Sequence, residues 1–309
     1  MTPVIETEQL TKWYGAHRGI VDLDLVIGEN EVFGFLGPNG AGKTTTIRTL
    51  LNLIRPTSGR ARVFGIETTA DPVAIHRQIG YLPGEFALYD RLTGGQTLDY
   101  FANLRGGVDR SYQRSLIDRF EIDPKRRYKE YSKGNKQKIG LVAALQHRPE
   151  LLILDEPTSG LDPLVQQTFF EVIAEAKAEG RTVFMSSHVL SEVEKSCDRV
   201  AIIRDGRLVT VDRVDALRGL AAHQVELRFD SEVPLEAFRV LPGVSDVVAE
   251  DHTLRMRVTG PMAPIIREAA RHDVAAFVSR EPSLEETFLA QYAGAAEMPA
   301  GAATGTDRS

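Results

Sequence analysis

The first part of the chain alternates short apolar stretches with turn residues, a pattern that is typical of strands and brief helices. A Gly-Glu-Asn turn at 28–30 and the Arg-Pro-Thr-Ser-Gly sequence at 55–59 interrupt the apolar runs. The expected strands are residues 4–10, 20–27, 31–36, 61–64 and 79–83, with helices over 47–53 and 73–78. Early strands joined by turns indicate an antiparallel sheet placed beside a mainly parallel one.

The strand pattern stops between residues 86 and 145, where apolar residues recur at helical spacing. We interpret this region as a helical subdomain inserted into an α/β core, ending in a long helix that runs to Gln146. The next run, Leu151-Leu152-Ile153-Leu154, has no polar alternation, which predicts a strand covered on both faces of a parallel sheet. Further elements are expected at 163–177 (helix), 182–186 (strand), 199–203 (strand) and 207–211 (strand), the last two joined by Asp205-Gly206, a strong hairpin signal.

The pattern beyond Leu220 predicts a second, smaller α+β domain. Strands at 225–229, 244–249, 253–258 and 274–278 alternate with helices at 235–241 and 264–271. This βαββαβ order is the ferredoxin-like arrangement. We therefore expect a first domain at 1–220 (helical subdomain about 86–145), an accessory domain at 222–292 and a disordered, Ala- and Gly-rich tail at 293–309.

Composition and charge exclude some classes of protein. The 309 residues carry a formal net charge of -6, which argues against nucleic acid as the main partner. Cys197 is the single cysteine, so an intrachain disulfide is impossible and a reducing compartment is expected. The acidic start, MTPVIETEQL, lacks the apolar core of a signal peptide, and no apolar run reaches the length of a membrane span.

The segment G-P-N-G-A-G-K-T-T at 37–45 matches the phosphate-binding loop pattern G-x-x-x-x-G-K-[ST]. Glycines at 37, 40 and 42 allow the backbone to wrap its N–H groups around a polyphosphate. The helix that follows directs its positive end toward the same anion. Lys43 is placed to reach the β- and γ-phosphates, and Thr44 to reach Mg²⁺. A simple Gly-rich turn between a strand and a helix is the alternative, which the flanking elements disfavour.

Two carboxylates and a histidine follow predicted parallel strands, at the edge where open α/β sheets bind ligands. Asp155 is expected to hold Mg²⁺, and Glu156 to accept a proton from the attacking water or to position that water. An acidic helix cap is the alternative for this pair. His188 follows the neighbouring strand, where a phosphate contact and an ordinary surface role are equally expected.

Together these motifs resemble the ATP-binding subunits of ABC transporters over residues 4 to about 218. The resemblance makes 37–45 the Walker A loop, with Pro38, Asn39, Ala41 and Thr45 as further nucleotide contacts, and 151–156 the Walker B strand with its catalytic Glu156. It implies that His188 is the switch histidine and that Tyr14 stacks on adenine, although adjacent aromatics such as Trp13 and Tyr14 are more often packing residues. It also places Asp162 in the D-loop, and Ser132 and Gly134 in the signature segment.

The resemblance implies that two ATPase subunits pair head to tail, with the signature segment of each closing over the ATP of the other. The wording Y-S-K-G-x-K-Q at 131–137 and the segment E-P-S-L-E-E-T-F-L at 281–289 are similar to drug- and antibiotic-export ATPases of the ABC-2 type. These work with a separate six-helix permease at the cytoplasmic face of the membrane. The expected function is therefore ATP-driven efflux of a drug, antibiotic or lipid-like compound, with ATP and Mg²⁺ as cofactors and a homodimer of ATPase subunits.

The sequence departs from the family at the Q-loop, where Gly84 replaces glutamine after Leu82-Pro83, and at Lys133 and Asn135 of the signature. We expect hydrolysis to survive and Glu85 to take part in coupling. A soluble ABC ATPase acting on ribosomes or nucleic acid is the alternative function. A non-hydrolysing binding module is a third, disfavoured by the retained catalytic residues.

Overall fold

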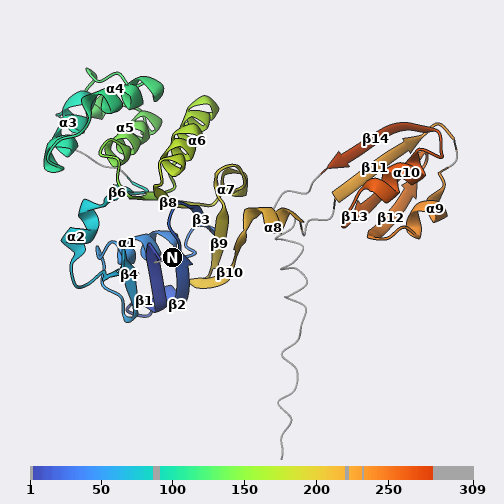
Figure 1. Ribbon diagram of the computed structural model, residues 1–309, viewed down its shortest axis with the longest axis horizontal. Helices are drawn as coiled ribbons and strands as arrows, with labels where there is room; N and C mark the ends of the chain where they lie inside the picture. The colour runs from blue at the N-terminus through green and yellow to red at the C-terminus, as the bar shows by residue number, and fades with distance from the viewer. Residues whose placement is uncertain (1–2, 86–90, 220–222, 232, 281–309) are drawn as a thin grey trace, which may run out of the picture. The chain divides into compact units, whose positions relative to one another are not determined.

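The computed structural model describes residues 3–85, 91–219, 223–231 and 233–280 (Figure 1). Contacts between Cα atoms divide the chain into two compact units, Met1–Val214 and Asp215–Ser309. Each unit has its own apolar core. The two units are therefore described separately. The predicted tail at 293–309 and the 281–289 segment lie outside the described residues.

An antiparallel sheet forms one end of the first unit, with the strand order β2-β1-β4-β5. Its strands are β1 (Ile5–Tyr14), β2 (His17–Ile27), β4 (Ser58–Val63) and β5 (Ile66–Glu67). The first two strands extend further than their apolar pattern predicts, because they continue to a tight turn in which Gly15 has a φ of +59°. This extension places Trp13 and Tyr14 at the end of β1.

The second sheet of this unit has the order β10-β9-β3-β8-β7-β6. Its strands are β3 (Val32–Leu36), β6 (Ile79–Leu82), β7 (Leu151–Asp155), β8 (Thr182–Ser187), β9 (Arg199–Arg204) and β10 (Arg207–Arg213). All neighbours pair in parallel except β9 and β10, which form the predicted hairpin. Every residue of β3, β7 and β8 is buried, as expected for strands covered on both faces.

Helices surround this parallel sheet, and three of them, α3, α4 and α5, gather at the end of the unit opposite the antiparallel sheet (Figure 1). The helices are α1 (Lys43–Leu50), α2 (Pro72–Arg77), α3 (Gly94–Leu104), α4 (Arg110–Arg119), α5 (Lys133–Leu145), α6 (Pro163–Ala178) and α7 (Leu190–Ser196), with a 3₁₀ turn at Tyr128–Glu130. The first helix begins at Lys43 and ends before the predicted Leu53, because Asn52 adopts a φ of 50°. Within the described part of the chain, none of the helices has the length and apolar character that a bilayer span requires.

Helix α8 (Val214–Gly219) begins at the boundary between the units, and the elements that follow it in the second unit have the predicted βαββαβ order. Its elements are β11 (His223–Phe229), α9 (Leu235–Arg239), β12 (Val244–Glu250), β13 (Thr253–Val258), α10 (Ala263–Ala269) and β14 (Val274–Arg280). The strand order β12-β13-β11-β14, with antiparallel pairs, confirms the ferredoxin-like fold. Phe238 and Ile265, one from each helix, are fully buried in its core.

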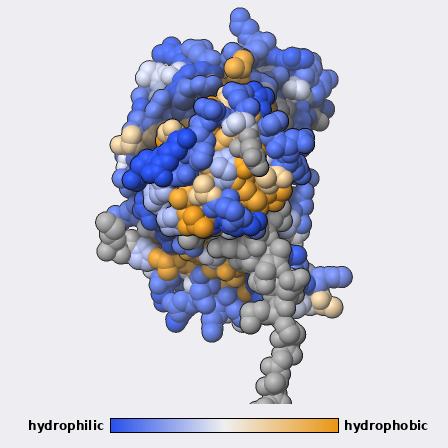
Figure 2. Space-filling model, turned by 90° about the vertical axis from the view of Figure 1, so that its right-hand side faces the viewer, coloured by the Kyte–Doolittle hydropathy of each residue, from blue (hydrophilic) through white to orange (hydrophobic). Residues whose placement is uncertain are grey.

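The face of the molecule shown in Figure 2 is mostly hydrophilic, with smaller groups of apolar residues. In the second unit the exposed large apolar residues include Val240, Val248, Ile266, Phe277 and Val278. Apolar residues exposed in small numbers are ordinary for a globular protein.

Candidate functional site

The Gly-rich loop connects β3 to α1 and lines a cavity of about 210 Å³. Glycine is required at two of its positions for different reasons. Gly42 has a φ of +112° at the helix N-cap, and a Cβ on Gly37 would lie 2.4 Å from the Ile203 carbonyl oxygen. Gly42, Lys43, Thr44 and Thr45, at the start of α1, line this cavity, and the first N–H groups of a helix have no partner within the helix, as an anion site requires. Tyr14 and Arg18 line the same cavity.

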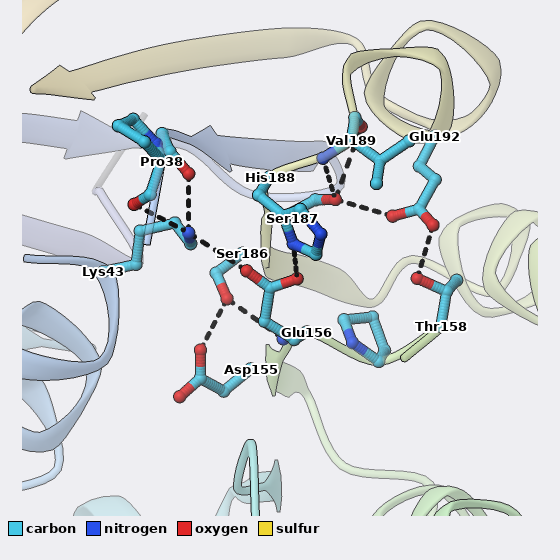
Figure 3. A network of polar contacts seen from close by, with 12 residues as sticks. Pro38, Lys43, Asp155, Glu156, Thr158, Ser186, Ser187, His188, Val189 and Glu192 are labelled. Carbon is cyan, nitrogen blue, oxygen red and sulfur yellow. Dashed lines mark hydrogen bonds and ion pairs between the residues drawn. The ribbon is translucent and has the colours of Figure 1, made fainter. Parts of the chain in front are cut away.

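Lys43, Glu156 and His188 come together beside this loop, although they lie far apart in the sequence. The Lys43 ammonium is 3.0 Å from Glu156 Oε1 and donates to the carbonyl oxygen of Gly37 at 2.6 Å. His188 Nδ1 lies 2.7 Å from Glu156 Oε2. Figure 3 shows the Glu156 carboxylate between these two side chains. The arrangement combines a cation, a carboxylate and an imidazole at the carboxyl ends of three strands.

Asp155 is fully buried at the end of β7 and is held by two hydroxyl groups. Thr44 Oγ1 donates to Asp155 Oδ2 at 2.7 Å, and Ser186 Oγ donates to Oδ1 at 2.6 Å. Burial, together with the charge of Asp155, raises the pKa of nearby Tyr81 to about 12, so this phenol stays neutral at physiological pH. The buried carboxylate beside a threonine hydroxyl fits Mg²⁺, which takes one or two protein oxygens and completes its shell with water and substrate phosphates. No cluster of three or more His, Cys, Asp or Glu side chains with metal-site spacing occurs in the described ranges.

The backbone of Glu156 is in a left-handed conformation, with a φ of 51°. Such a conformation costs on the order of 1–3 kcal/mol for a residue other than glycine and persists only when its surroundings hold it. Ser186 Oγ accepts the Glu156 N–H at 3.0 Å, and Gln137 Nε2 donates to the carbonyl oxygens of Glu156 and Pro157, both at 3.1 Å. The turn therefore points the Glu156 carboxylate toward the Gly-rich loop instead of continuing the strand.

The predicted signature residues lie at the N-terminus of α5, where Ser132 caps the helix by accepting the Asn135 N–H at 3.3 Å. A Cβ on Gly134 would lie 2.3 Å from the Gly160 carbonyl oxygen, so α5 and the loop after β7 approach closely. Asp162 caps α6, and the hydrogen bond from the Val165 N–H lowers the pKa of its carboxyl group. Within the described chain, Ser132, Gly134 and Asp162 do not line the cavity of the Gly-rich loop.

Tyr14 is 44% exposed at the end of β1, and the Lys12 ammonium lies 5.3 Å from the centre of its ring. The sequence favoured a packing role for the adjacent aromatics Trp13 and Tyr14, but Tyr14 is exposed where it lines the cavity. The same rim holds Arg18, whose guanidinium is 2.8 Å from Asp205 Oδ1. A Cβ on Gly84 would lie 3.2 Å from Asp155 Oδ2, so position 84 faces that carboxylate, whereas Glu85 is exposed.

Sequence reasoning missed three residues that shape this site: Arg18, Gln137 and Ser186. Ser186 stands in the Ser-Ser-His run that ends a buried strand, and this polar ending was the available signal. Gln137 is 5% exposed on a helix that buries mostly apolar residues, and only the fold reveals its acceptors. Arg18 carried no pattern that separates it from a surface arginine.

Comparison with known proteins agrees with this geometry. The ABC transporter family model matches residues 20–159. The chain is 33% identical to the bacitracin transport ATP-binding protein BcrA of Enterococcus faecalis, over 93% of this chain and 96% of that protein. It is 35% identical to the daunorubicin/doxorubicin resistance ATP-binding protein DrrA of Streptomyces peucetius, over 94% and 92% of the two chains. It is also 31% identical to the linearmycin resistance ATP-binding protein LnrL of Bacillus subtilis, over 93% and 97%.

Among solved structures, an ATP-binding subunit of an ABC transporter superposes with a TM-score of 0.65 and 32% identity, over 70% of this chain and 92% of that one. The dimeric structure of a bacterial ABC transporter cassette, at 21% identity and a TM-score of 0.63, has the same fold. The extent of these similarities, together with the site described above, shows that the chain belongs to the ATP-binding subunits of ABC transporters and is an ATPase of that family.

Proposed function

We propose that this protein powers the export of a drug, antibiotic or lipid-like compound through a separate membrane permease. The single observation that carries the proposal is the meeting of Lys43 and His188 at the Glu156 carboxylate. Lys43, Thr44 and Glu156 line the cavity of the Gly-rich loop, and Asp155 accepts a hydrogen bond from Thr44. The names of three relatives that align over nearly their whole length, which refer to bacitracin transport and to daunorubicin or linearmycin resistance, support the choice of cargo class.

In this proposal each part of the cavity holds one part of MgATP. Tyr14 stacks on the adenine, and the backbone of residues 37–45, with the Lys43 ammonium, surrounds the β- and γ-phosphates. Thr44 and Asp155 hold Mg²⁺, which neutralises charge that develops on the phosphate oxygens. Phosphates offer Lys43 stronger acceptors than the carbonyl oxygen of Gly37 does.

Glu156 then acts on the attacking water. As the water oxygen bonds to the γ-phosphorus, its proton passes to the Glu156 carboxylate and the bond from that phosphorus to the β-phosphate oxygen breaks, releasing ADP and phosphate. His188 contacts the far oxygen of the same carboxylate at 2.7 Å and so fixes its orientation. The supported left-handed turn at Glu156 keeps the base in place before substrate arrives.

The Ser132–Gly134 helix tip and Asp162 serve a second nucleotide in this proposal. A helix N-terminus with an exposed serine is suited to a phosphate, and these residues do not line their own chain's cavity. Two copies paired head to tail bring each tip over the γ-phosphate bound by the other copy. ATP then favours the closed pair, and hydrolysis removes that bias.

Replacing Gly134 with alanine is expected to lower ATPase activity at least tenfold. The new methyl group meets the Gly160 carbonyl oxygen at 2.3 Å, so either the tip of α5 or the loop before Asp162 must shift, and a displacement near 1 Å costs about 100-fold in a positioned reaction. Steady-state phosphate release measures the effect. The matched control is Gly28→Ala, at a glycine outside the left-handed region where the nearest atom to a Cβ would be Glu31 Oε1 at 3.6 Å. Wild-type activity in the Gly134→Ala protein would contradict the proposed close contact.

The permease in this proposal is a six-helix ABC-2 type protein, so the ATPase is peripheral at the cytoplasmic face of the membrane. The cytoplasmic helices of the permease contact the ATPase on the surface around residue 85 and on the helical subdomain. Gly84 puts no side chain toward Asp155, so the exposed Glu85 carries the coupling task that the family assigns to glutamine. The alternative, a soluble ATPase on ribosomes or nucleic acid, is disfavoured by the net charge of -6.

This function predicts that a neighbouring reading frame encodes a six-helix membrane protein, and coexpression of the two proteins tests it. In a drug-sensitive host the pair should raise resistance to at least one exported compound, and a Glu156→Gln version should not. The two proteins should copurify in detergent. Copurification with ribosomes, and no resistance to any compound of a broad panel, would favour the alternative.

A further inference from the structure

Glu192 lies on α7 with 8% of its surface exposed, and neither the motifs nor the catalytic cluster account for it. Its two carboxylate oxygens have different partners. Oε1 accepts from Thr158 Oγ1 at 2.7 Å, and Oε2 accepts from Ser187 Oγ at 2.6 Å. A buried carboxylate is costly unless it is well hydrogen-bonded, so two short bonds to hydroxyl groups explain how it is tolerated here.

The two hydroxyl groups belong to the two chain segments that carry the proposed catalytic pair. Thr158 follows Glu156 by two residues, in the loop that leaves β7, and Ser187 directly precedes His188 at the end of β8. Ser187 Oγ also accepts the N–H of Val189 at 2.9 Å, so hydrogen bonds hold the chain on both sides of His188 (Figure 3). The Glu192 carboxylate is thus the bridge between the segment of the base and the segment of the histidine.

Close packing holds helix α7, and with it Glu192, in place. Val193, the next residue, is fully buried, and a Cβ on Gly34 would lie 2.9 Å from its Cγ1 atom. Helix α7 therefore packs closely on β3, the strand that leads into the Gly-rich loop. His188 itself is 48% exposed at its side chain, so the hydrogen bonds of its neighbours matter for its position.

We propose that Glu192 is a positioning residue, which holds the His188 turn and the loop after Glu156 in register so that imidazole and carboxylate stay in contact. It touches neither the cavity of the Gly-rich loop nor Lys43 in the described chain. Loss of the bridge therefore slows the chemical step and leaves nucleotide affinity nearly unchanged. The inference rests on the proposed catalytic role of Glu156 and His188.

The test compares steady-state ATPase kinetics of the full-length protein and its variants. Glu192→Ala removes both acceptors and should lower kcat about 10- to 100-fold, with the KM for ATP within about twofold of wild type. Glu192→Gln can still accept from Thr158 and donate to Ser187, so it should keep at least half of the wild-type kcat. Lys195→Ala, on the exposed side of the same helix, is the matched control and should leave both constants unchanged.

Thr158→Val removes one of the two bonds with little change of shape, and it provides the answer if Glu192→Ala does not fold. It should lower kcat several-fold at unchanged KM. The inference is overturned if Glu192→Ala, or failing that Thr158→Val, keeps wild-type kcat, or if Glu192→Gln loses as much activity as Glu192→Ala. A parallel Glu156→Gln measurement distinguishes failure of this inference from failure of the proposed function. Normal turnover in that variant rejects the catalytic role of Glu156, independently of the results for the Glu192 variants.

Discussion

Replacing Glu156 with glutamine is expected to lower phosphate release by about 100- to 10,000-fold, the range for loss of a general base. The amide has nearly the shape of the carboxylate but does not accept the proton of the attacking water. Its backbone contacts to Ser186 and Gln137 do not involve the altered group, so the left-handed turn is preserved. ATP affinity should therefore remain close to wild type, as measured by equilibrium binding of a fluorescent ATP analogue.

Glu150→Gln is the matched control, because this exposed glutamate precedes the same strand at its other end. It should hydrolyse ATP at the wild-type rate. Phosphate release that is unchanged in Glu156→Gln would remove Glu156 from the role of base, and an equal loss in both variants would point to a general effect of removing negative charge.

Replacing Lys43 with alanine should weaken binding of MgATP itself by about 10- to 100-fold, because a hydrogen bond to a charged group contributes about 1.5–3 kcal/mol. The side chain is 6% exposed and its ammonium reaches both the Gly-rich loop and Glu156. Its loss removes the cation that faces the phosphates and leaves Glu156 without its ion pair. Hydrolysis should fall as well. The weaker binding of MgATP is therefore what distinguishes this variant from Glu156→Gln.

Isothermal titration with MgATP measures this difference, and Lys125→Ala, at an exposed position, provides the control. Wild-type affinity in the Lys43→Ala protein would contradict the placement of the phosphates in this loop.

Local patterns of apolar and polar residues predict much of the fold. The continuous apolar run at 151–154 predicted a covered parallel strand, and the alternation beyond residue 220 predicted the ferredoxin-like order. The elements that escaped prediction are short. Helix α7 has seven residues and follows a strand directly, so its apolar positions are too few to show a helical period.

The candidate site likewise has a part that local motifs predict and a part that they do not. The Gly-rich loop and the Asp155-Glu156 pair are local motifs, and the expectation that His188 follows the strand beside Asp155 agrees with the parallel pairing of β7 and β8. The left-handed backbone of Glu156 was not predictable, because its supports come from Gln137 and Ser186, which lie 19 and 30 residues away. Contacts of this kind depend on tertiary packing, which no local pattern encodes.

Light scattering of the Glu156→Gln protein with and without saturating MgATP tests the central claim, that two copies clamp nucleotide between the Gly-rich loop of one and the Ser132–Gly134 tip of the other. We expect ATP to double the particle mass, ADP to leave it unchanged, and an added Ser132→Arg substitution to abolish the doubling. A protein that remains a single copy with saturating MgATP, both alone and in the presence of its permease, would contradict this claim.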